Sequence, residues 1–323
     1  MIITRTPFRV SFAGGGTDLP EFYRGHGHGA VVSATIKKYM YIVIHPYFHD
    51  KIRIKYSKTE DVDDVDAIEH PIVRECLRRV GVETGVEIAS FADVSAGTGL
   101  GSSSSFTVGL LHALYAYKGK MVSRDRLAEE ACEIEIDLLQ EPIGKQDQYA
   151  AAFGGLNHIR FNRDETVEVT PVLLGAGMKK ELESRFRLYY VGGSHNARDI
   201  LQEQQDNIRN KTIANACLEN ILRQVQDLTE VLANGQIAAI GPILHDGWLQ
   251  KKKLSAAISN AAIDIFYDKA RMCGSSGGKL LGAGGAGFLL LDHGNHDDLA
   301  GQMACKSIPL ELDTQGSKVI FFE

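Results

Sequence analysis

The first half of the chain alternates segments with strand-like and helix-like residue patterns. Runs rich in β-branched and aromatic residues predict strands at 2–13, 31–46, 51–56, 86–91, 156–161 and 166–172. An apolar segment that begins at Phe106 predicts a buried helix. A second helix is expected after Ser123, because serine is a good N-cap residue. This order indicates a mixed sheet covered by helices.

The second half of the chain is largely helical in pattern. The segment at 175–185 is predicted to cross between the two domains, and a strand is predicted at 187–191. The predicted helices then cover 197–233, 237–245 and 254–273. A glycine-rich loop, a strand at 288–291, a helix and a terminal strand end the chain. Each half therefore combines strands with packed helices.

The length of the chain favours two domains. A single hydrophobic core stops growing at about 250–300 residues, and this chain has 323. We therefore predict an α+β protein with an N-terminal domain at 1–175 and a C-terminal domain at 176–323, facing each other across a cleft. No internal repeat interrupts this organisation.

Composition and charge exclude several classes of protein. The net charge of −6 provides no overall basic field for nucleic acid or an anionic membrane. The five cysteines are scattered, which is typical of free thiols rather than a disulfide framework or a zinc site. No apolar run approaches the roughly 20 residues that span a bilayer, and the N-terminus has no signal-peptide pattern. The sequence predicts a cytoplasmic protein.

The segment VSAGTGLGSSSS at 94–105 is the strongest indication of chemistry in the chain. Gly97, Gly99 and Gly101 allow sharp turns and a close approach of the backbone to a ligand. The serines that follow open a helix, whose free N–H groups and dipole form a binding site for phosphate. A Walker A loop is excluded because no G-K-[ST] ends the segment. The alternative is a flexible turn before a core helix.

The segment LLGAGGAGFLLL contains G-x-G-x-x-G at Gly282, Gly284 and Gly287. A dinucleotide-binding loop needs a strand before these glycines and a helix after them. The expected order here is the reverse, with a helix before and a strand after. We therefore expect the glycines to let this loop approach a ligand that is bound by the first domain. A glycine-rich turn without a ligand is the alternative.

Three segments together resemble the motifs of the GHMP kinases, a family that includes galactokinase, homoserine kinase, mevalonate kinase and phosphomevalonate kinase. They are TPFRVSFAGGGTDLP, GTGLGSSSS and KLLGAGGAGF, in this order along essentially the whole chain. The resemblance implies a ribosomal-protein-S5-like N-terminal domain and a ferredoxin-like C-terminal domain, with ATP and substrate between them. GGGTDLP, PIGKQDQYAAAFGG and GGKLLGAGGAGF look most like the bacterial D-glycero-D-manno-heptose 7-phosphate kinases. In place of GGGTDLP, galactokinases usually carry a version with Gly-Glu-His-Thr-Asp.

The resemblance implies two catalytic residues. Asp147 lies in a Pro-x-Gly-x-x-Asp frame that matches the catalytic loop, where the aspartate orients or deprotonates the attacking hydroxyl. Arg9 matches a basic residue near the transferred phosphate. The alternatives are a surface or capping aspartate and a solvated arginine that points outward from its strand.

A magnesium site is expected at Glu135 and Ser103. Glu135 lies at helical spacing from Ala131 and Leu138, on the flank of an apolar stripe, where a buried carboxylate needs a partner. The resemblance implies Mg²⁺ as that partner and Ser103 as a second ligand, and Mg²⁺ accepts few protein ligands. A buried salt bridge is the alternative. Glu130, Glu133 and Asp137 are expected on a solvated face.

The same resemblance implies two sets of binding residues. The residues expected to bind ATP are Gly97, Gly99, Leu100, Gly101, Ser102, Ser103 and Ser104. The residues expected to bind the sugar are Gly15, Gly16, Thr17, Asp18, Gly284 and Gly285. Asp18 has an alternative role as an N-cap of a helix that starts near Leu19.

A substrate phosphate would need a local cation, since the protein has a net negative charge. The candidates are Arg198, one of Lys251 to Lys253, and His26 or His28. An arginine is expected near the segment SHNARD at 194–199 in the heptose kinases, and Arg198 is the substitute here. A solvated helix end and ordinary loop histidines are the alternatives.

These observations lead to one expected function. The resemblance implies ATP- and Mg²⁺-dependent phosphorylation of the anomeric hydroxyl of D-glycero-D-manno-heptose 7-phosphate, which gives the 1,7-bisphosphate for surface-glycan precursors such as capsule, lipopolysaccharide or S-layer. The alternatives are a galactokinase- or fucokinase-like sugar 1-kinase and a kinase-like sensor that binds ATP and sugar without turnover. The sequence leaves the oligomeric state open.

Overall fold

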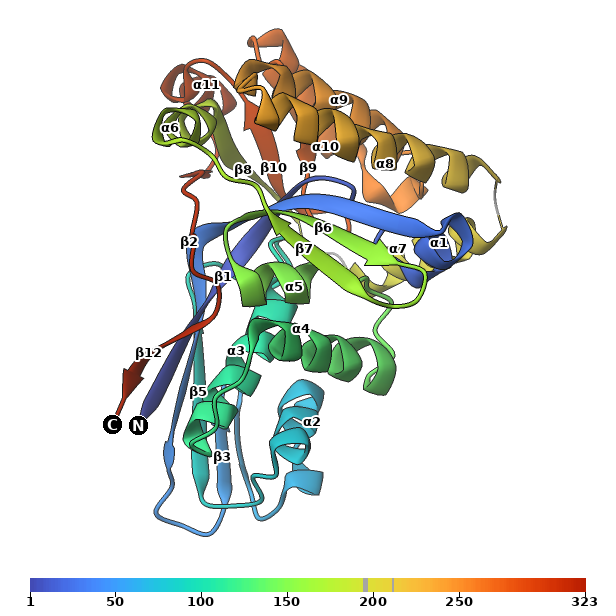
Figure 1. Cartoon of the computed structure of the whole chain (residues 1–323). Helices are drawn as coiled ribbons and strands as arrows, with labels where there is room; N and C mark the ends of the chain where they lie inside the picture. Colours follow the sequence, from blue (N-terminus) through green and yellow to red (C-terminus); the bar gives the residue numbers. More distant parts are fainter. Residues whose placement is uncertain (194–196, 211) are drawn as a thin grey trace.

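A computed structural model describes residues 1–193, 197–210 and 212–323, and they form two β-sheets with helices packed against each (Figure 1). The larger sheet has the strand order β12-β1-β2-β5-β3-β4, and β6 pairs with both β2 and β7. Its strands are β1 (Ile2–Ala13), β2 (His28–Pro46), β3 (Ile52–Lys55), β4 (Thr59–Val62), β5 (Val86–Ala92), β6 (Leu156–Asn162), β7 (Val167–Pro171) and β12 (Lys318–Phe322).

Five α-helices cover the larger sheet, and the third of them begins in the glycine and serine segment. They are α1 (Pro20–His26), α2 (Pro71–Val80), α3 (Ser102–Tyr117), α4 (Arg124–Cys132) and α5 (Gln146–Phe153). Helix α3 packs against both β1 and β2 and is buried around most of its circumference, as its apolar sequence predicts. The hydroxyl of Ser123 accepts a hydrogen bond from the backbone N–H of Arg126, so the predicted cap of α4 is confirmed.

The smaller sheet has the strand order β11-β8-β10-β9 and lies beneath the helices of the second half. Its strands are β8 (Phe186–Gly192), β9 (Gly277–Leu280), β10 (Gly287–Asp292) and β11 (Ser307–Pro309). The helices are α6 (Ala176–Arg185), α7 (Ala197–Asn210), α8 (Thr212–Ala233), α9 (Ile240–Lys251), α10 (Ala261–Met272) and α11 (His296–Met303). Trp248 of α9 is fully buried against this sheet and its helices.

The end of the chain returns to the larger sheet. Strand β12 pairs antiparallel with β1, and the two chain termini lie side by side (Figure 1). Before β12 begins, the backbone N–H of Asp313 donates to the carbonyl oxygen of Thr35 in β2, and the hydroxyl of Thr35 donates to the carbonyl oxygen of Asp313. The predicted division at 175/176 lies between β7 of the larger sheet and β8 of the smaller sheet, whereas β12 pairs with the first strand of the chain.

The structure corrects three details of the predicted second half. The helix expected at 197–233 is two helices, α7 and α8, and residue 211 between them lies outside the described residues. The helix expected at 254–273 is a short 3₁₀ turn, Ala256–Ile258, followed by α10. Strand β9 then precedes the glycine-rich loop, so the expectation that a helix directly precedes it is wrong. The dinucleotide-binding context is still absent, because β10 rather than a helix follows the glycines.

Glu135 lies in a π-helical turn, Glu133–Leu138, that continues α4. A π turn is wider than an α turn, so the predicted helical spacing fails at its end and Leu138 is exposed. Glu130 was expected on a solvated face, but it is buried, where Tyr115 and Arg126 donate hydrogen bonds to its carboxylate. The helical spacing in the sequence therefore predicted the buried position of Glu135 correctly and the exposed position of Glu130 wrongly.

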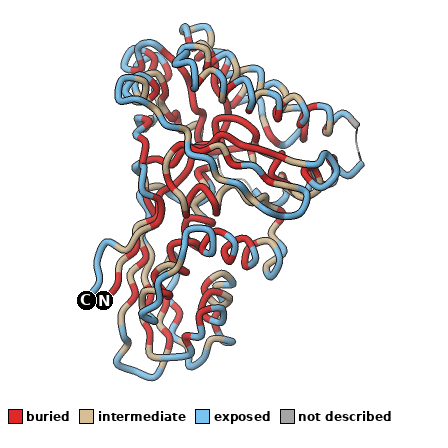
Figure 2. Tube along the Cα trace, in the orientation of Figure 1, coloured by how far each residue is buried: buried red, intermediate tan, exposed pale blue. Residues whose placement is uncertain are grey.

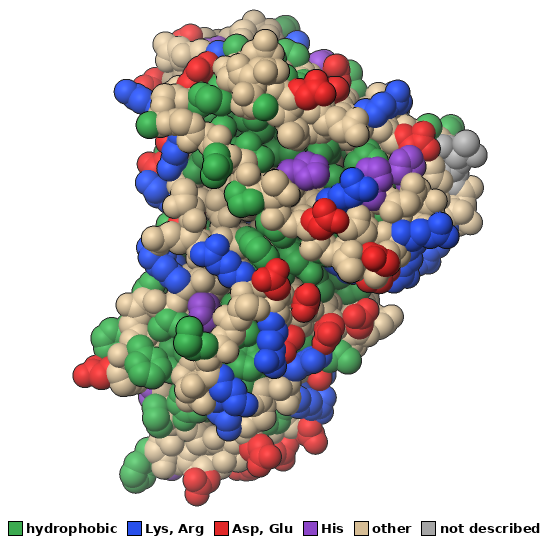
Figure 3. Space-filling model, in the orientation of Figure 1, with side chains coloured by type: hydrophobic (Ala, Val, Ile, Leu, Met, Phe, Trp, Pro, Cys, Tyr) green, Lys and Arg blue, Asp and Glu red, His purple; other side chains and the backbone are tan. Residues whose placement is uncertain are grey.

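Buried residues run through the strands of both sheets and through the helix faces that meet them (Figure 2). Acidic and basic side chains are interspersed on the face shown in Figure 3, in keeping with the small net charge of −6. No helix among the described residues is long and apolar enough to cross a membrane.

Candidate active site

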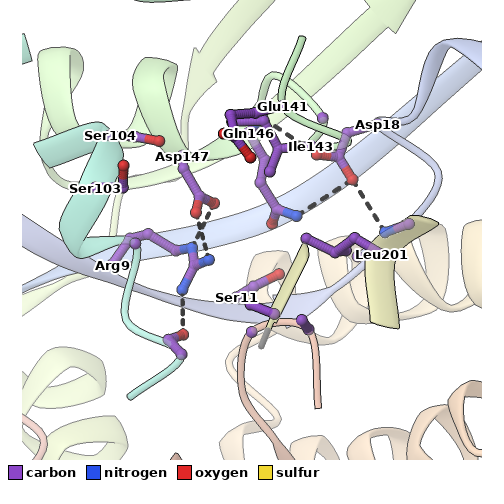
Figure 4. A pocket seen from close by; sticks show the side chains of 18 of the residues that line it. Arg9, Ser11, Asp18, Ser103, Ser104, Glu141, Ile143, Gln146, Asp147 and Leu201 are labelled. Atoms are coloured by element: carbon purple, nitrogen blue, oxygen red, sulfur yellow. Dashed lines mark hydrogen bonds and ion pairs between the residues drawn. The ribbon is translucent and has the colours of Figure 1, made fainter. Parts of the chain in front are cut away.

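A cavity of about 300 Å³ lies where the two halves of the chain meet, and all three sequence motifs contribute to its lining. Arg9 and Asp18 come from the first motif, Ser103 from the second and Gly282 from the third. Figure 4 shows the first two motifs around this space, with Asp147 and Arg9 pointing toward one another. The geometry therefore brings together residues that lie far apart in the sequence.

The glycine and serine segment forms the start of α3 on one side of the cavity. Gly97, Gly99 and Gly101 all have positive φ angles, 75°, 82° and 73°, which favour glycine. Ser102, Ser103 and Ser104 follow in the first turn of α3 and line the cavity with the three glycines. Leu100 does not line it. Its side chain is buried, and its carbonyl accepts a hydrogen bond from the backbone N–H of Arg9 at 3.0 Å.

The glycine-rich loop between β9 and β10 packs directly against this segment. A Cβ atom at Gly99 would lie 2.6 Å from the carbonyl oxygen of Leu281, and one at Gly282 would lie 2.4 Å from the Cα atom of Gly99. The two backbones can approach this closely only because both residues lack a side chain. The third motif therefore supports the loop of the second motif and reaches the cavity through Gly282 and Ala283.

Arg9 and Asp147 form a two-point ion pair. The Nε atom of Arg9 donates to Oδ1 of Asp147 at 2.7 Å, and Nη2 donates to Oδ2 at 2.6 Å. Arg9 is only 5% exposed, so the alternative of a solvated arginine is wrong. The third guanidinium nitrogen donates to the carbonyl oxygen of Gly99, which ties the pair to the second motif. Asp147 lies in the first turn of α5 and faces the cavity.

Glu135 is 1% exposed and lies beside Ser103. The hydroxyl of Ser103 donates to Oε1 at 2.9 Å, and Nε2 of Gln148 donates to Oε2 at 2.7 Å. Burial raises the pKa of Glu135 to about 7, against the lowering effect of these hydrogen bonds. Within the described part of the chain no basic side chain lies within 4.0 Å of this carboxylate, so the salt-bridge alternative is not supported.

Asp18 lies at the opposite end of the cavity (Figure 4). Its carboxylate accepts hydrogen bonds from the backbone N–H of Gly16 at 3.0 Å and from the side chain of Gln146 at 3.2 Å. Burial, and then the nearby charge of Asp147, raise the pKa of Asp18 to about 6. The N-cap of α1 is Leu19 and receives no side-chain hydrogen bond, so the capping alternative for Asp18 is wrong.

The other residues expected to bind sugar divide into two groups. Gly15 and Gly16 line the cavity, whereas the Thr17 hydroxyl is buried and donates to backbone carbonyls of Gly14 and Ala30. Gly284 and Gly285 pack against Ile258 instead of facing the cavity. The geometry therefore gives Thr17, Gly284 and Gly285 a structural position and does not support direct contact with sugar.

Only some of the candidates for a contact with a substrate phosphate line the cavity. Arg198 lines the cavity and pairs with Glu141 at 2.8 Å, whereas residues 194–196 of the SHNARD segment lie outside the described residues. His26 stacks on Phe22, and His28 lies in β2, so neither lines the cavity. Lys252 and Lys253 lie outside the cavity lining as well. Lys251 does line it and is buried, so a solvated helix end is wrong for this residue.

Several cavity residues were missed by sequence reasoning. Lys279 lies on the unpredicted strand β9, and Gln204 and Leu201 lie on α7. Ser11 follows Arg9 by two residues on the same face of β1, and Lys279 is the first residue of the third motif, so the sequence held a signal for both. The others come from elements whose approach to the first motif is purely tertiary.

Comparisons with known proteins agree with this architecture. The model of the GHMP kinase N-terminal domain matches residues 68–155, and that of the GHMP kinase C-terminal domain matches residues 228–309, together more than half of the chain. The D-glycero-alpha-D-manno-heptose 7-phosphate kinase of Campylobacter jejuni is 29% identical over 89% of this chain and 88% of its own length. The L-fucokinase/L-fucose-1-P guanylyltransferase of Bacteroides fragilis is 26% identical over 89% of this chain but only 34% of its own.

Among solved structures, a D-glycero-D-manno-heptose 1-phosphate kinase from Bacteroides thetaiotaomicron is similar over the whole of both chains, with a TM-score of 0.82 and 25% identity. The fold, the two matched domains and the three converging motifs are consistent with one another. This chain therefore belongs to the GHMP kinase family and is a kinase, a phosphotransferase whose acceptor is a hydroxyl group.

Proposed function

We propose that this protein is an ATP-dependent sugar kinase that phosphorylates the anomeric hydroxyl of D-glycero-D-manno-heptose 7-phosphate to give the 1,7-bisphosphate. The heptose 7-phosphate kinase of Campylobacter jejuni, similar over almost all of both chains, supports this substrate. The observation that carries the proposal is the cavity itself, in which a phosphate-binding helix start, the Arg9–Asp147 pair and Asp18 face one space.

Asp147 is the proposed base. Its carboxylate is oriented by two hydrogen bonds from Arg9, at 2.7 and 2.6 Å, and lies beside the first turn of α3. A hydroxyl bound between Asp147 and the helix start would give its proton to this carboxylate as its oxygen attacks the terminal phosphorus of ATP. The leaving ADP would stay on the backbone N–H groups of the serine segment.

Asp18 and Gln146 are the proposed contacts to the sugar hydroxyls. The Oε1 atom of Gln146 is buried and has no hydrogen-bond partner among the described residues. Gln146 lines the cavity beside Asp18, to which its side chain donates a hydrogen bond. Buried polar atoms are rarely left unpaired, so a polyhydroxylated substrate that pairs with them fits this end of the cavity.

Glu135 and Ser103 would hold Mg²⁺. The carboxylate is buried, has only neutral partners and has a raised pKa, which is the situation that a bound cation relieves. One carboxylate and one hydroxyl are enough protein ligands for Mg²⁺, which keeps several waters and binds phosphate oxygens. When bound, Mg²⁺ supplies positive charge to the phosphates of ATP.

A coupled assay of ADP release tests the proposal. The panel comprises heptose 7-phosphate, heptose 1-phosphate, free heptose, galactose and L-fucose, and phosphorus NMR of the product identifies the phosphorylated position. Heptose 7-phosphate is expected to have the highest kcat/KM and to give the 1,7-bisphosphate. Preferred turnover of L-fucose or galactose would favour a sugar 1-kinase of another specificity, as the fucokinase similarity suggests. ATP and sugar binding without any turnover would indicate a sensor.

A further inference from the structure

Two lysines from the second half of the chain enter the cavity. Lys251 ends α9, and Lys279 lies in the middle of β9. They are 8% and 7% exposed, and both line the cavity beside Arg9 and Ser11. Each ammonium group donates to backbone carbonyls, Lys251 to Leu280 and Gly282 and Lys279 to Phe12 at 3.3 Å.

Neither lysine has a carboxylate partner among the described residues, because no Asp or Glu oxygen lies within 4.0 Å of either Nζ atom. Burial lowers the pKa of Lys251 well below its ordinary value, and the charges of Lys279 and Arg9 lower it further. Burial also lowers the pKa of Lys279 to about 8, with Arg9 adding to the effect and Asp18 opposing it.

A buried charge without a partner is strongly unfavourable, and so is the mutual repulsion of two such charges. Backbone carbonyls offset only part of this cost. The nearby carboxylate of Asp147 does not offset the rest, because both of its oxygens already accept hydrogen bonds from Arg9. The second half therefore contributes two amino groups to the ligand-free site, and no carboxylate of the described residues pairs with either of them.

A second observation points to an anionic ligand at the same place. Ser11 lies two residues after Arg9 on β1, its side chain is buried, and its hydroxyl has no hydrogen-bond partner among the described residues. The serine segment 102–105 contains no lysine, unlike a Walker A loop, so its own residues supply no side-chain cation to a phosphate.

We propose that Lys251, Lys279 and the hydroxyl of Ser11 form a subsite that binds one phosphate dianion in the cavity, with Arg9 as the neighbouring charge. The subsite rests on the proposed function. The phosphate comes from one of two sources, the terminal phosphoryl group of ATP or the phosphate that the sugar substrate already carries. The two lysines are therefore the cations that the second half of the chain supplies to the phosphate-binding segment of the first.

Binding of inorganic phosphate tests the subsite without any assumption about turnover. The variants are Lys251→Met and Lys279→Met, with Lys279→Arg to retain the charge. Lys269→Met is the matched control, because Lys269 also donates to a backbone carbonyl but is exposed on α10. Phosphate and AMP-PNP are expected to raise the thermal midpoint of the wild type, the control and Lys279→Arg. The rise with phosphate is expected to be at least halved in each of the two methionine variants.

The ligand-free midpoints separate this role from a structural one. If the lysines are held for a ligand, each methionine variant should be as stable as the wild type or more stable, because a buried charge has been removed. The proposal is overturned if the midpoints of the methionine variants lie well below that of the control while phosphate still raises them. The lysines would then only support the backbone carbonyls to which they donate. Should a methionine variant not fold, the glutamine variant at the same position replaces it.

Kinetics distinguish the two sources. If the sugar phosphate occupies the subsite, the methionine variants raise the KM of the phosphorylated sugar at least tenfold and leave an unphosphorylated sugar unchanged. If the terminal phosphoryl group of ATP occupies it, kcat falls at least tenfold with both sugars. Wild-type values in both experiments overturn the proposal. Absence of turnover of any sugar by the wild type would refute the proposed function. The rise of the thermal midpoint with phosphate would still test the subsite.

Discussion

Arg9 on β1 and Asp147 on α5 meet across the cavity through two hydrogen bonds, at 2.7 and 2.6 Å. The guanidinium also donates to the carbonyl oxygen of Gly99, so one side chain links β1, α5 and the glycine and serine segment. An arginine that donates three hydrogen bonds, two to one carboxylate and one to a carbonyl, has little rotational freedom. The carboxylate of Asp147 is therefore held in one orientation before any substrate binds.

Asp147→Asn is expected to lower kcat by about 100-fold or more, in the range typical for loss of a general base. The asparagine preserves size and can still accept a hydrogen bond from Arg9, so the KM of ATP should change little. Steady-state kinetics with saturating sugar measure the effect, and Asp137→Asn, an exposed acid, serves as the control. Wild-type turnover of the asparagine variant would sink the assignment of Asp147 as base.

Glu135→Gln is expected to change stability in a way that depends on pH. Burial places the pKa of Glu135 at about 7 in the folded protein, above the ordinary value of 4.5, so the folded state binds this proton more tightly than the unfolded chain. Wild-type stability contributed by this group is therefore present below pH 4.5 and is lost as pH rises through 7. The glutamine variant does not suffer this loss and should be more stable at pH 8, by up to ~3 kcal/mol.

Urea unfolding of both proteins at pH 5 and pH 8, without metal, measures this difference. Addition of Mg²⁺ with a nucleotide should stabilise the wild type more than the variant, because the ligand carboxylate is missing in the latter. The variant should also need more Mg²⁺ for half-maximal activity. Equal Mg²⁺ titrations of two folded proteins would argue against Glu135 as a metal ligand.

Gly99→Ala is expected to disturb the contact between the second and third motifs. A Cβ atom there would lie 2.6 Å from the carbonyl oxygen of Leu281, whereas a Cβ atom at Gly97 would meet no atom within 4 Å. The two residues have similar positive φ angles, 82° and 75°, so each alanine variant bears a similar backbone strain, about 1–3 kcal/mol. The difference in stability between the two variants therefore measures the effect of the close approach of residue 99 to Leu281.

Thermal unfolding should therefore show a clearly larger loss of stability for Gly99→Ala than for Gly97→Ala. The KM of ATP should rise more in the same variant, because the phosphate-binding segment is displaced. Equal losses of stability in the two variants would mean that the close packing of Gly99 on Gly282 contributes nothing measurable.

Sugar affinity is expected to depend on the ionisation of Asp18. Burial and the charge of Asp147 raise its pKa to about 6, so the carboxylate that accepts hydrogen bonds from hydroxyl groups forms between pH 5 and pH 7. The KM of the sugar should fall about tenfold over this interval, at saturating ATP and Mg²⁺. Asp18→Asn should raise this KM and remove most of the pH dependence. A pH profile that stays the same in the asparagine variant would assign the titration to another group.

Local features of the sequence determined much of the fold and part of the candidate site. A run rich in β-branched and aromatic residues predicted β1 over its full length, Ile2–Ala13, and the glycine and serine segment predicted a helix start where α3 begins. The three motifs, taken together, identified the family. These predictions succeed because strand periodicity, helix capping and positive φ angles depend on residues that are neighbours in the chain.

The tertiary structure decided which of these residues face one another. Arg9 points inward rather than to solvent because Asp147 and Gly99 lie opposite it, and no property of β1 alone reveals that. Lys251 looked like the first residue of a solvated lysine run, yet the packing of α9 on β9 buries its ammonium group beside Lys279. Side-chain direction at such positions is determined by contacts between segments far apart in sequence. The pattern within one segment therefore defines the element, and only the assembled fold determines its partners.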